Sequence, residues 1–113
     1  MRPKDYIQGV FHQMDTARII LVRELEKYSG KAFNGYSYLD ANSEQTHFVI
    51  TSVGHIHDRR IVNTALIVQL INDTIIIDRD IFDKPLVDAL LQAGVPRSQI
   101  ILSYAGEPVP ELT

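Results

Sequence analysis

Two histidines and an aspartate, His55, His57 and Asp58, are the residues of this chain best suited to metal chemistry. On an extended segment, side chains at positions i and i+2 point to the same side, so the two imidazoles could share a divalent metal ion. Asp58 or His47 would supply a third ligand. The residues fall in a polar turn predicted over residues 54–58, with no further ligand at a defined spacing. An exposed turn is the simpler interpretation, and a small metal-dependent enzyme is an alternative.

Three aspartates, Asp78, Asp80 and Asp83, form a second candidate cluster. Carboxylates are hard oxygen ligands that suit Mg²⁺ or Ca²⁺. The segment lacks the central glycine and the distal glutamate of a calcium-binding loop. Asp83 also has the position of a helix N-cap, with Pro85 in the first turn of the helix. We therefore predict structural roles for these aspartates, and we expect no metal and no cofactor.

A local basic cluster is formed by Arg59 and Arg60 beside His55 and His57, and Arg97 is a further candidate contact residue. Guanidinium groups bind phosphates or the carboxylates of a protein partner. The formal net charge of −3 and the pI of about 5.7 oppose a general attraction to nucleic acid. We interpret these five residues as a partner or phosphate contact, and we expect no direct nucleic-acid binding.

Sequence motifs for catalysis are missing from the chain. It contains no Gly-x-Ser-x-Gly elbow, no Walker loop, no Gly-x-Gly-x-x-Gly and no zincin histidine pair. The serines each fit a capping, turn or strand position. The sequence therefore predicts a protein that is not an enzyme.

The elements that position these residues follow from hydrophobic periodicity. One domain over residues 1–113 is expected, with residues 105–113 as a surface tail. The pattern predicts an α+β fold of the order α-β-β-β-β-α-β, in which a long helix precedes a four-stranded antiparallel meander, a short helix and a final strand. The expected bounds are a helix over 4–29, strands over 36–41, 46–53, 59–71 and 74–78, a helix between Asp83 and Gly94, and a strand over 100–104, with a loop over 31–35.

The long strand predicted over residues 59–71 is apolar on both faces. A strand of this kind is normally buried on both faces, but one layer of helices covers only one. We therefore expect a homodimer or higher oligomer in which two sheets pack together. The alternating residues are Leu66, Val68 and Leu70 on one face and Ala65, Ile67 and Ile71 on the other.

Composition predicts a soluble cytoplasmic protein. Hydrophobic residues make up 45% and charged residues 22%, which is ordinary for a globular domain. The chain has no cysteine, in keeping with a reducing compartment. The first residues lack a signal-peptide pattern, and no apolar run is long enough to span a membrane.

The order and spacing of the motifs in the second half resemble the XisI family, the excision controlling factors associated with a nitrogen-fixation DNA element. A Tyr-led N-terminal helix, Tyr6 to Tyr28, also suits the family, whereas His55 stands where the family usually has Trp. The matching residues are Val53-Gly54, Arg59-Arg60-Ile61-Val62, Ile71-Asn72-Asp73, Ile75-Ile76-Ile77, Asp80, Leu90 and Gly94-Val95-Pro96-Arg97-Ser98-Gln99-Ile100-Ile101-Leu102.

The resemblance implies an XisI-like fold and a small non-enzymatic accessory protein, linked to control of site-specific DNA excision. Family members are encoded beside XisH-type proteins, whose own family is nuclease-like. An acidic chain without an active-site motif is better suited to bind such an XisH-like protein than to read bases. A direct DNA-binding excision factor, acting through Arg59, Arg60 and Arg97, is the alternative that the resemblance leaves open.

Overall fold

The computed structural model describes residues 13–110 of the chain, and the side chains from residue 16 onward. The first part of the helix predicted over residues 4–29 lies outside the described residues. The elements are α2 (Gln13–Glu26), β1 (Gly30–Ala32), β2 (Gly35–Ala41), β3 (His47–Ile56), β4 (Arg59–Ile71), β5 (Thr74–Asp80), α3 (Leu86–Gln92), the 3₁₀ turn η1 (Arg97–Gln99), β6 (Ile100–Leu102) and the 3₁₀ turn η2 (Ser103–Ala105).

Over residues 13–110 the sheet has six strands in the order β1-β2-β3-β4-β5-β6. The four predicted strands form the expected antiparallel meander, so the α+β class is confirmed. Only the pairing of β5 with β6 is parallel, and α3 makes the crossover between them. The loop predicted over residues 31–35 is wrong in part, because Gly30–Ala32 adds a short exposed edge strand against β2. The predicted last strand ends at Leu102 instead of Tyr104.

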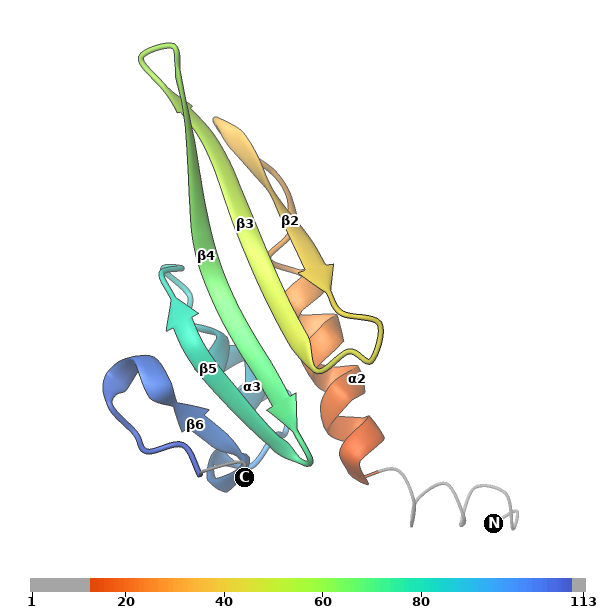
Figure 1. Cartoon of the computed structure of the whole chain (residues 1–113). Coiled ribbons are helices and arrows are strands. Elements are labelled where there is room, and N and C mark those ends of the chain that lie inside the picture. Colours follow the sequence, from red (N-terminus) through yellow and green to blue (C-terminus); the bar gives the residue numbers. More distant parts are fainter. Residues whose placement is uncertain (1–12, 111–113) are drawn as a thin grey trace, which may run out of the picture.

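Both helices cover the same face of the sheet, behind the strands in Figure 1. From α2, Ala17, Leu21 and Leu25 enter the core at steps of four residues, which places them on one side of the helix. Leu66 and Val68 of β4 meet them and are fully buried. In the part of the chain that the structure describes, neither helix covers the opposite face. Within the described residues, no helix is long and apolar enough to cross a membrane.

The short helix α3 is capped differently from the prediction. The proposed N-cap, Asp83, is wrong, because Pro85 holds the N-cap position and makes no side-chain cap. Asp80 at the end of β5 instead accepts the backbone N–H of Leu86 at 2.7 Å and of Phe82 at 3.0 Å. A carboxylate at the strand end therefore satisfies an N–H at the start of the helix that has no partner within it.

The C-terminus of α3 is closed by a Schellman motif. Gly94 has φ +102°, and its N–H donates to the carbonyl of Leu91, while Val95 donates to Leu90. Val95 and Leu90 are both buried in the core, which is the hydrophobic contact expected of this motif. The predicted helix stop at Gly94 thus corresponds to a glycine in the left-handed region.

Candidate functional site: a projecting hairpin arm

The β3–β4 hairpin projects beyond the rest of the sheet, at the top of Figure 1. On one side, β5 pairs with β4 only from Leu66 onward. On the other side, β2 pairs with β3 only as far as Gly54. We call residues 51–64 the arm. Its base is marked by a bulge between Ile50 and Thr51, where β4 carries one extra residue.

The strand predicted over residues 46–53 is too short, because the polar turn expected over residues 54–58 is wrong in its extent. Strand β3 continues to Ile56, and only His57 and Asp58 form the turn. Their φ angles are 52° and 64°, the left-handed geometry of a type I′ hairpin. Histidine and aspartate are among the non-glycine residues that tolerate this region best, so the sequence does contain the turn signal.

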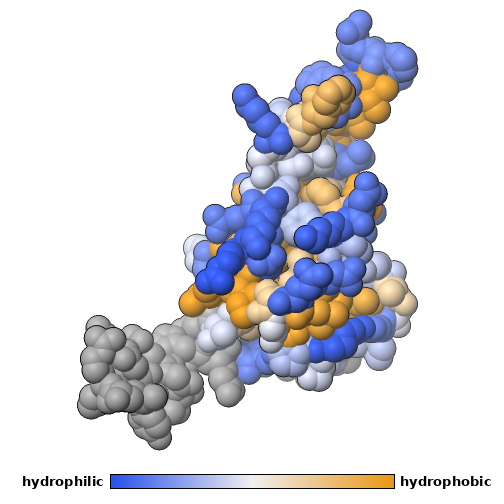
Figure 2. All heavy atoms as spheres, turned by 180° about the vertical axis from the view of Figure 1, so that it is seen from behind, coloured by the Kyte–Doolittle hydropathy of each residue, from blue (hydrophilic) through white to orange (hydrophobic). Residues whose placement is uncertain are grey.

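The two faces of the arm carry different side chains, because residues alternate along each strand. Ile56, Arg59 and Ile61 lie on one side of the arm, which continues the sheet face that the helices cover. We call this side the inner face. Ile56 is 50% exposed and Ile61 is 37% exposed. Figure 2, seen from the helix side, shows hydrophobic atoms exposed beside the polar tip of the hairpin.

The opposite side of the arm, which we call the outer face, carries His55, Arg60 and Val62. Val62 is 47% exposed. Four of the five predicted contact residues, His55, His57, Arg59 and Arg60, therefore lie together at the tip, but the two arginines point to opposite faces.

The fifth predicted contact residue, Arg97, lies far from the tip. Ile100, just after η1, pairs with Ile75, which pairs with Leu70. Leu70 is eleven residues along β4 from Arg59, or roughly 36 Å. Arg97 donates to the carbonyl of Ile100 at 2.7 Å and forms an ion pair with Glu107 at 2.5 Å.

Arg97 therefore links the start of β6 to the segment that follows β6. Its partner Glu107 also accepts the N–H of Leu102 at 2.9 Å. Both contacts favour the charged carboxylate, and the backbone hydrogen bond is the larger cause that lowers the pKa of Glu107. The predicted surface tail is thus tied to β6 over its first residues.

The metal hypothesis rested on His55 and His57 sharing a regular extended segment, and that premise is wrong. The left-handed backbone at His57 breaks the alternation of side chains after Ile56. His47 lies at the other end of β3, eight residues or roughly 26 Å from His55. The described residues hold no group of three or more histidine or carboxylate side chains arranged to bind a metal.

The three aspartates Asp78, Asp80 and Asp83 do not form a cluster around one site. Asp80 caps α3, and Asp78 accepts a hydrogen bond from the amide of Gln69 at 2.9 Å. Asp83 is exposed beside the pocket between α2 and the β5–α3 loop. Asp78 and Asp80 thus have separate structural contacts, and Asp83 lies apart from both on the surface.

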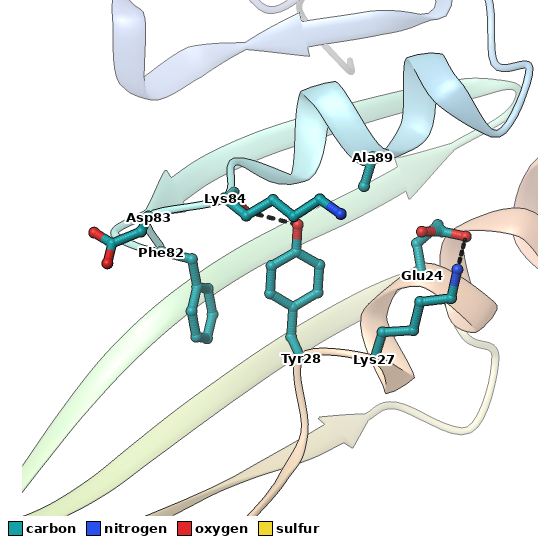
Figure 3. A pocket seen from close by; sticks show the side chains of 7 residues that line it. All are labelled: Glu24, Lys27, Tyr28, Phe82, Asp83, Lys84 and Ala89. Atoms are coloured by element: carbon teal, nitrogen blue, oxygen red, sulfur yellow. Dashed lines mark hydrogen bonds and ion pairs between the residues drawn. The ribbon is translucent and has the colours of Figure 1, made fainter. Parts of the chain in front are cut away.

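A cavity of about 440 Å³ lies where the end of α2 meets the β5–α3 loop (Figure 3). The Tyr28 hydroxyl donates to the carbonyl of Lys84 at 2.8 Å, and its ring lies 4.9 Å from the ring of Phe82. The buried Glu24 forms an ion pair with Lys27 at 2.9 Å. The contacts of Tyr28 join the end of α2 to the loop, and the Tyr28 hydroxyl, Glu24 and Lys27 each have a partner within the fold.

Burial is the largest cause that raises the pKa of the Tyr28 phenol, to about 12. The nearby carboxylates Asp80, Glu24 and Asp88 raise it further. Tyr28 therefore stays a neutral hydrogen-bond donor well above neutral pH. This chemistry favours a structural joint between α2 and the loop over a catalytic phenolate.

Comparison with known proteins identifies a family. The family model described as XisI protein matches residues 12–113. A crystal structure of a XisI-like protein from Anabaena variabilis ATCC 29413 superposes with a TM-score of 0.56 at 19% identity, covering 82% of this chain and 84% of that chain. The fdxN element excision controlling factor XisI from the same organism has a TM-score of 0.54 at 22% identity, with the same two coverages. No curated protein matches the chain.

Proposed function

Because this chain belongs to the XisI family, we propose that it is a non-enzymatic accessory protein that controls excision of a DNA element by binding a protein partner. A solved relative is described as an excision controlling factor, and this description supports a role in DNA-element excision. The family resemblance supports an XisH-like protein as the partner. The acidic balance of the chain favours a protein over DNA.

The main support for this proposal is the set of exposed side chains on the inner face of the arm. Ile56 and Ile61 are exposed there beside Arg59, on a hairpin that projects away from the body. Exposed aliphatic side chains next to an arginine have the composition of a protein interface core. A projecting two-stranded hairpin also presents them without obstruction from the helices.

DNA binding remains the second candidate, and the placement of the arginines argues against it. Arg59 and Arg60 point to opposite faces of the arm. Arg97 lies at the far end of the sheet and is paired with Glu107. A duplex held by phosphate contacts needs several cations on one surface.

The test is an affinity pull-down of the tagged chain from its host, with nuclease added at moderate salt, read by mass spectrometry. We expect an XisH-like protein at near-equal stoichiometry with the wild type. Ile61→Asp places a charge on the inner face and should abolish recovery. Val62→Asp makes the same change one residue later, on the outer face, and should preserve it.

Two results would count against the proposal. If nuclease treatment removes every partner, the contact runs through DNA and the second candidate takes its place. If Ile61→Asp and Val62→Asp lower recovery equally, the inner face is not the docking surface. Circular dichroism of both variants checks that each one is folded.

A further inference from the structure

We propose that the partner protein binds by adding an extended strand to the sheet, along the edge of β4 that has no neighbouring strand in the arm. This edge consists of residues 59–64, and we call it the open edge. The inference rests on the proposed function and deepens it, because it names the kind of segment that docks and the backbone groups that receive it.

The two edges of the arm differ in what lies beside them. Beside β3, strand β2 pairs along the lower part of the arm, and the carbonyl of Asn34 accepts the N–H of His55 at 3.0 Å. Beside β4, the ladder with β5 ends at Leu66, and one further bond joins the N–H of Ile81 to the carbonyl of Ala65. From there to the tip, no strand of the described chain lies beside β4, and residues 59–64 are all exposed (Figure 1).

The hairpin turn determines which backbone groups of β4 point towards β3. In a hairpin with a two-residue turn, the residues that flank the turn exchange hydrogen bonds, and here these are Ile56 and Arg59. Backbone groups of an antiparallel strand then alternate between its two neighbours. Arg59, Ile61 and Asn63 therefore bond to β3.

The remaining residues of the open edge point their backbone groups outward. Arg60 and Val62 each present one N–H and one C=O on the side away from β3. Thr64 points the same way, since its carbonyl accepts a hydrogen bond from Nε of Arg79 on β5. A row of alternating donors and acceptors is satisfied by another extended strand, and strand addition to a sheet edge is a recurring mode of peptide recognition.

Guanidinium groups lie at both ends of the open edge. Arg59 and Arg60 lie at the tip, one on each face of the arm. Arg79 lies at the other end, where it holds the carbonyl of Thr64. Residues 61–63 between them are uncharged. The strand that fits this edge therefore has carboxylates near its two ends and uncharged residues between them, with an aliphatic side chain on the inner face.

Carboxylates of this chain offset little of that positive charge. Asp78 is bound to the amide of Gln69, and Asp80 is bound to backbone N–H groups at the start of α3. Asp83 lines the cavity beside α2. Asp58, in the turn, is the aspartate next to the arginines of the tip. Three arginines beside one such aspartate favour an acidic strand as the occupant.

A second copy of this chain is a poor occupant of the same edge. With Val62 opposite Val62 of the other copy, Arg60 would face Thr64, whose carbonyl Arg79 already holds. With Val62 opposite Arg60, the two Arg60 side chains would be diagonal neighbours on the outer face. Both registers bring guanidinium groups of the two copies together, and like charges on neighbouring strands are destabilising. The arginines that repel a second copy attract an acidic strand.

The experiment repeats the nuclease-treated pull-down with Val62→Pro and Val62→Ala. Proline removes the outward N–H of residue 62 and places its ring in the open edge, but it leaves the hydrogen bonds between β3 and β4 in place. Alanine also truncates the side chain but keeps the N–H. We expect Val62→Pro to lower recovery of the XisH-like protein at least about tenfold, and Val62→Ala to stay near the wild type.

Amide hydrogen exchange provides a second test that needs no substitution, and it decides the case if circular dichroism shows that Val62→Pro is unfolded. In the free chain, the amides of Arg60 and Val62 should exchange faster than those of Ile61 and Asn63, which bond to β3. Addition of the purified partner should slow exchange at Arg60 and Val62 at least about tenfold. Unchanged exchange at these two amides in the complex would overturn the proposal.

The outcomes separate this inference from the proposed function. Equal recovery by the wild type and Val62→Pro, with loss in Ile61→Asp, would contradict strand addition and leave the proposed function standing. Equal losses in Val62→Pro and Val62→Ala would assign the contact to the valine side chain and contradict strand addition as well. A wild-type chain that recovers no partner would contradict both. A wild-type dimer in sedimentation equilibrium that Val62→Pro dissociates would assign the open edge to a second copy instead.

Discussion

At the scale of single residues, position in the fold determines which of two side chains of the same type has a given structural role. Asp80 and Asp83 are both acidic and lie three residues apart, but only Asp80 accepts backbone N–H groups at the start of α3. Arg59 and Arg60 are adjacent but occupy opposite faces of the arm. Sequence proximity alone therefore groups residues that have separate roles.

The pair of aspartates gives a direct stability prediction. Asp80→Ala removes the acceptor of two backbone hydrogen bonds and should lower the free energy of unfolding by about 1–2 kcal/mol. Asp83→Ala should change it by no more than about 0.5 kcal/mol, as for other exposed positions. Chemical denaturation of both variants measures the difference. Equal losses would mean that Asp83 supports α3 after all.

At the scale of elements, the close approach of β2 and β3 at the last pair of these two strands depends on one glycine. Gly35 and Gly54 are cross-strand partners. A Cβ at Gly35 would lie 1.9 Å from the carbonyl oxygen of Val53, whereas a Cβ at Gly54 would meet only the carbonyl of Asn34 at 4.0 Å. The strands can pair at this point because Gly35 has no side chain.

Substitutions at this glycine pair should therefore differ in effect. Gly35→Ala forces the two backbones apart and should destabilise the fold by about 1–3 kcal/mol, the usual range for overpacking. Gly54→Ala adds the same methyl group in open space and should be near neutral. Thermal unfolding of the two variants compares them. A similar melting temperature for both would show that the sheet adjusts around residue 35 without cost.

At the scale of the whole molecule, Tyr28 connects the turn that follows α2 to the loop before α3. The groups that raise its pKa come from α2, β5 and α3, so its ionisation reports on the assembly of all three. The phenol has an ordinary pKa of 10.0 and a folded pKa of about 12. Stability from this difference is complete below pH 10 and is lost as the pH rises towards 12.

This linkage predicts the pH dependence of unfolding. The unfolded chain releases the Tyr28 proton first, so the free energy of unfolding of the wild type should fall between about pH 10 and pH 12. Tyr28→Phe should show a shallower fall over the same range, because only the other groups remain. Tyr104, whose pKa is also raised by burial, supplies part of that remaining slope. Identical slopes would show that Tyr28 ionises alike in both states.

The sequence by itself determined the α+β class, the meander, the helix stop at Gly94 and the family. These features depend on local periodicity, on glycine and proline positions and on motif order, all of which are written along the chain. The gathering of His55, His57, Arg59 and Arg60 at one turn was also predictable, because those residues are neighbours in sequence.

Only the tertiary structure decided the length of the arm, the capping of α3 by Asp80 and the separation of Arg97 from the tip. Each depends on which strands end first and on which distant segments meet. A two-residue turn at His57-Asp58 extends both strands, and alternation then sends Arg59 and Arg60 to opposite faces. A single residue of error in the position of a turn exchanges the faces, which is why local patterns could not assign them.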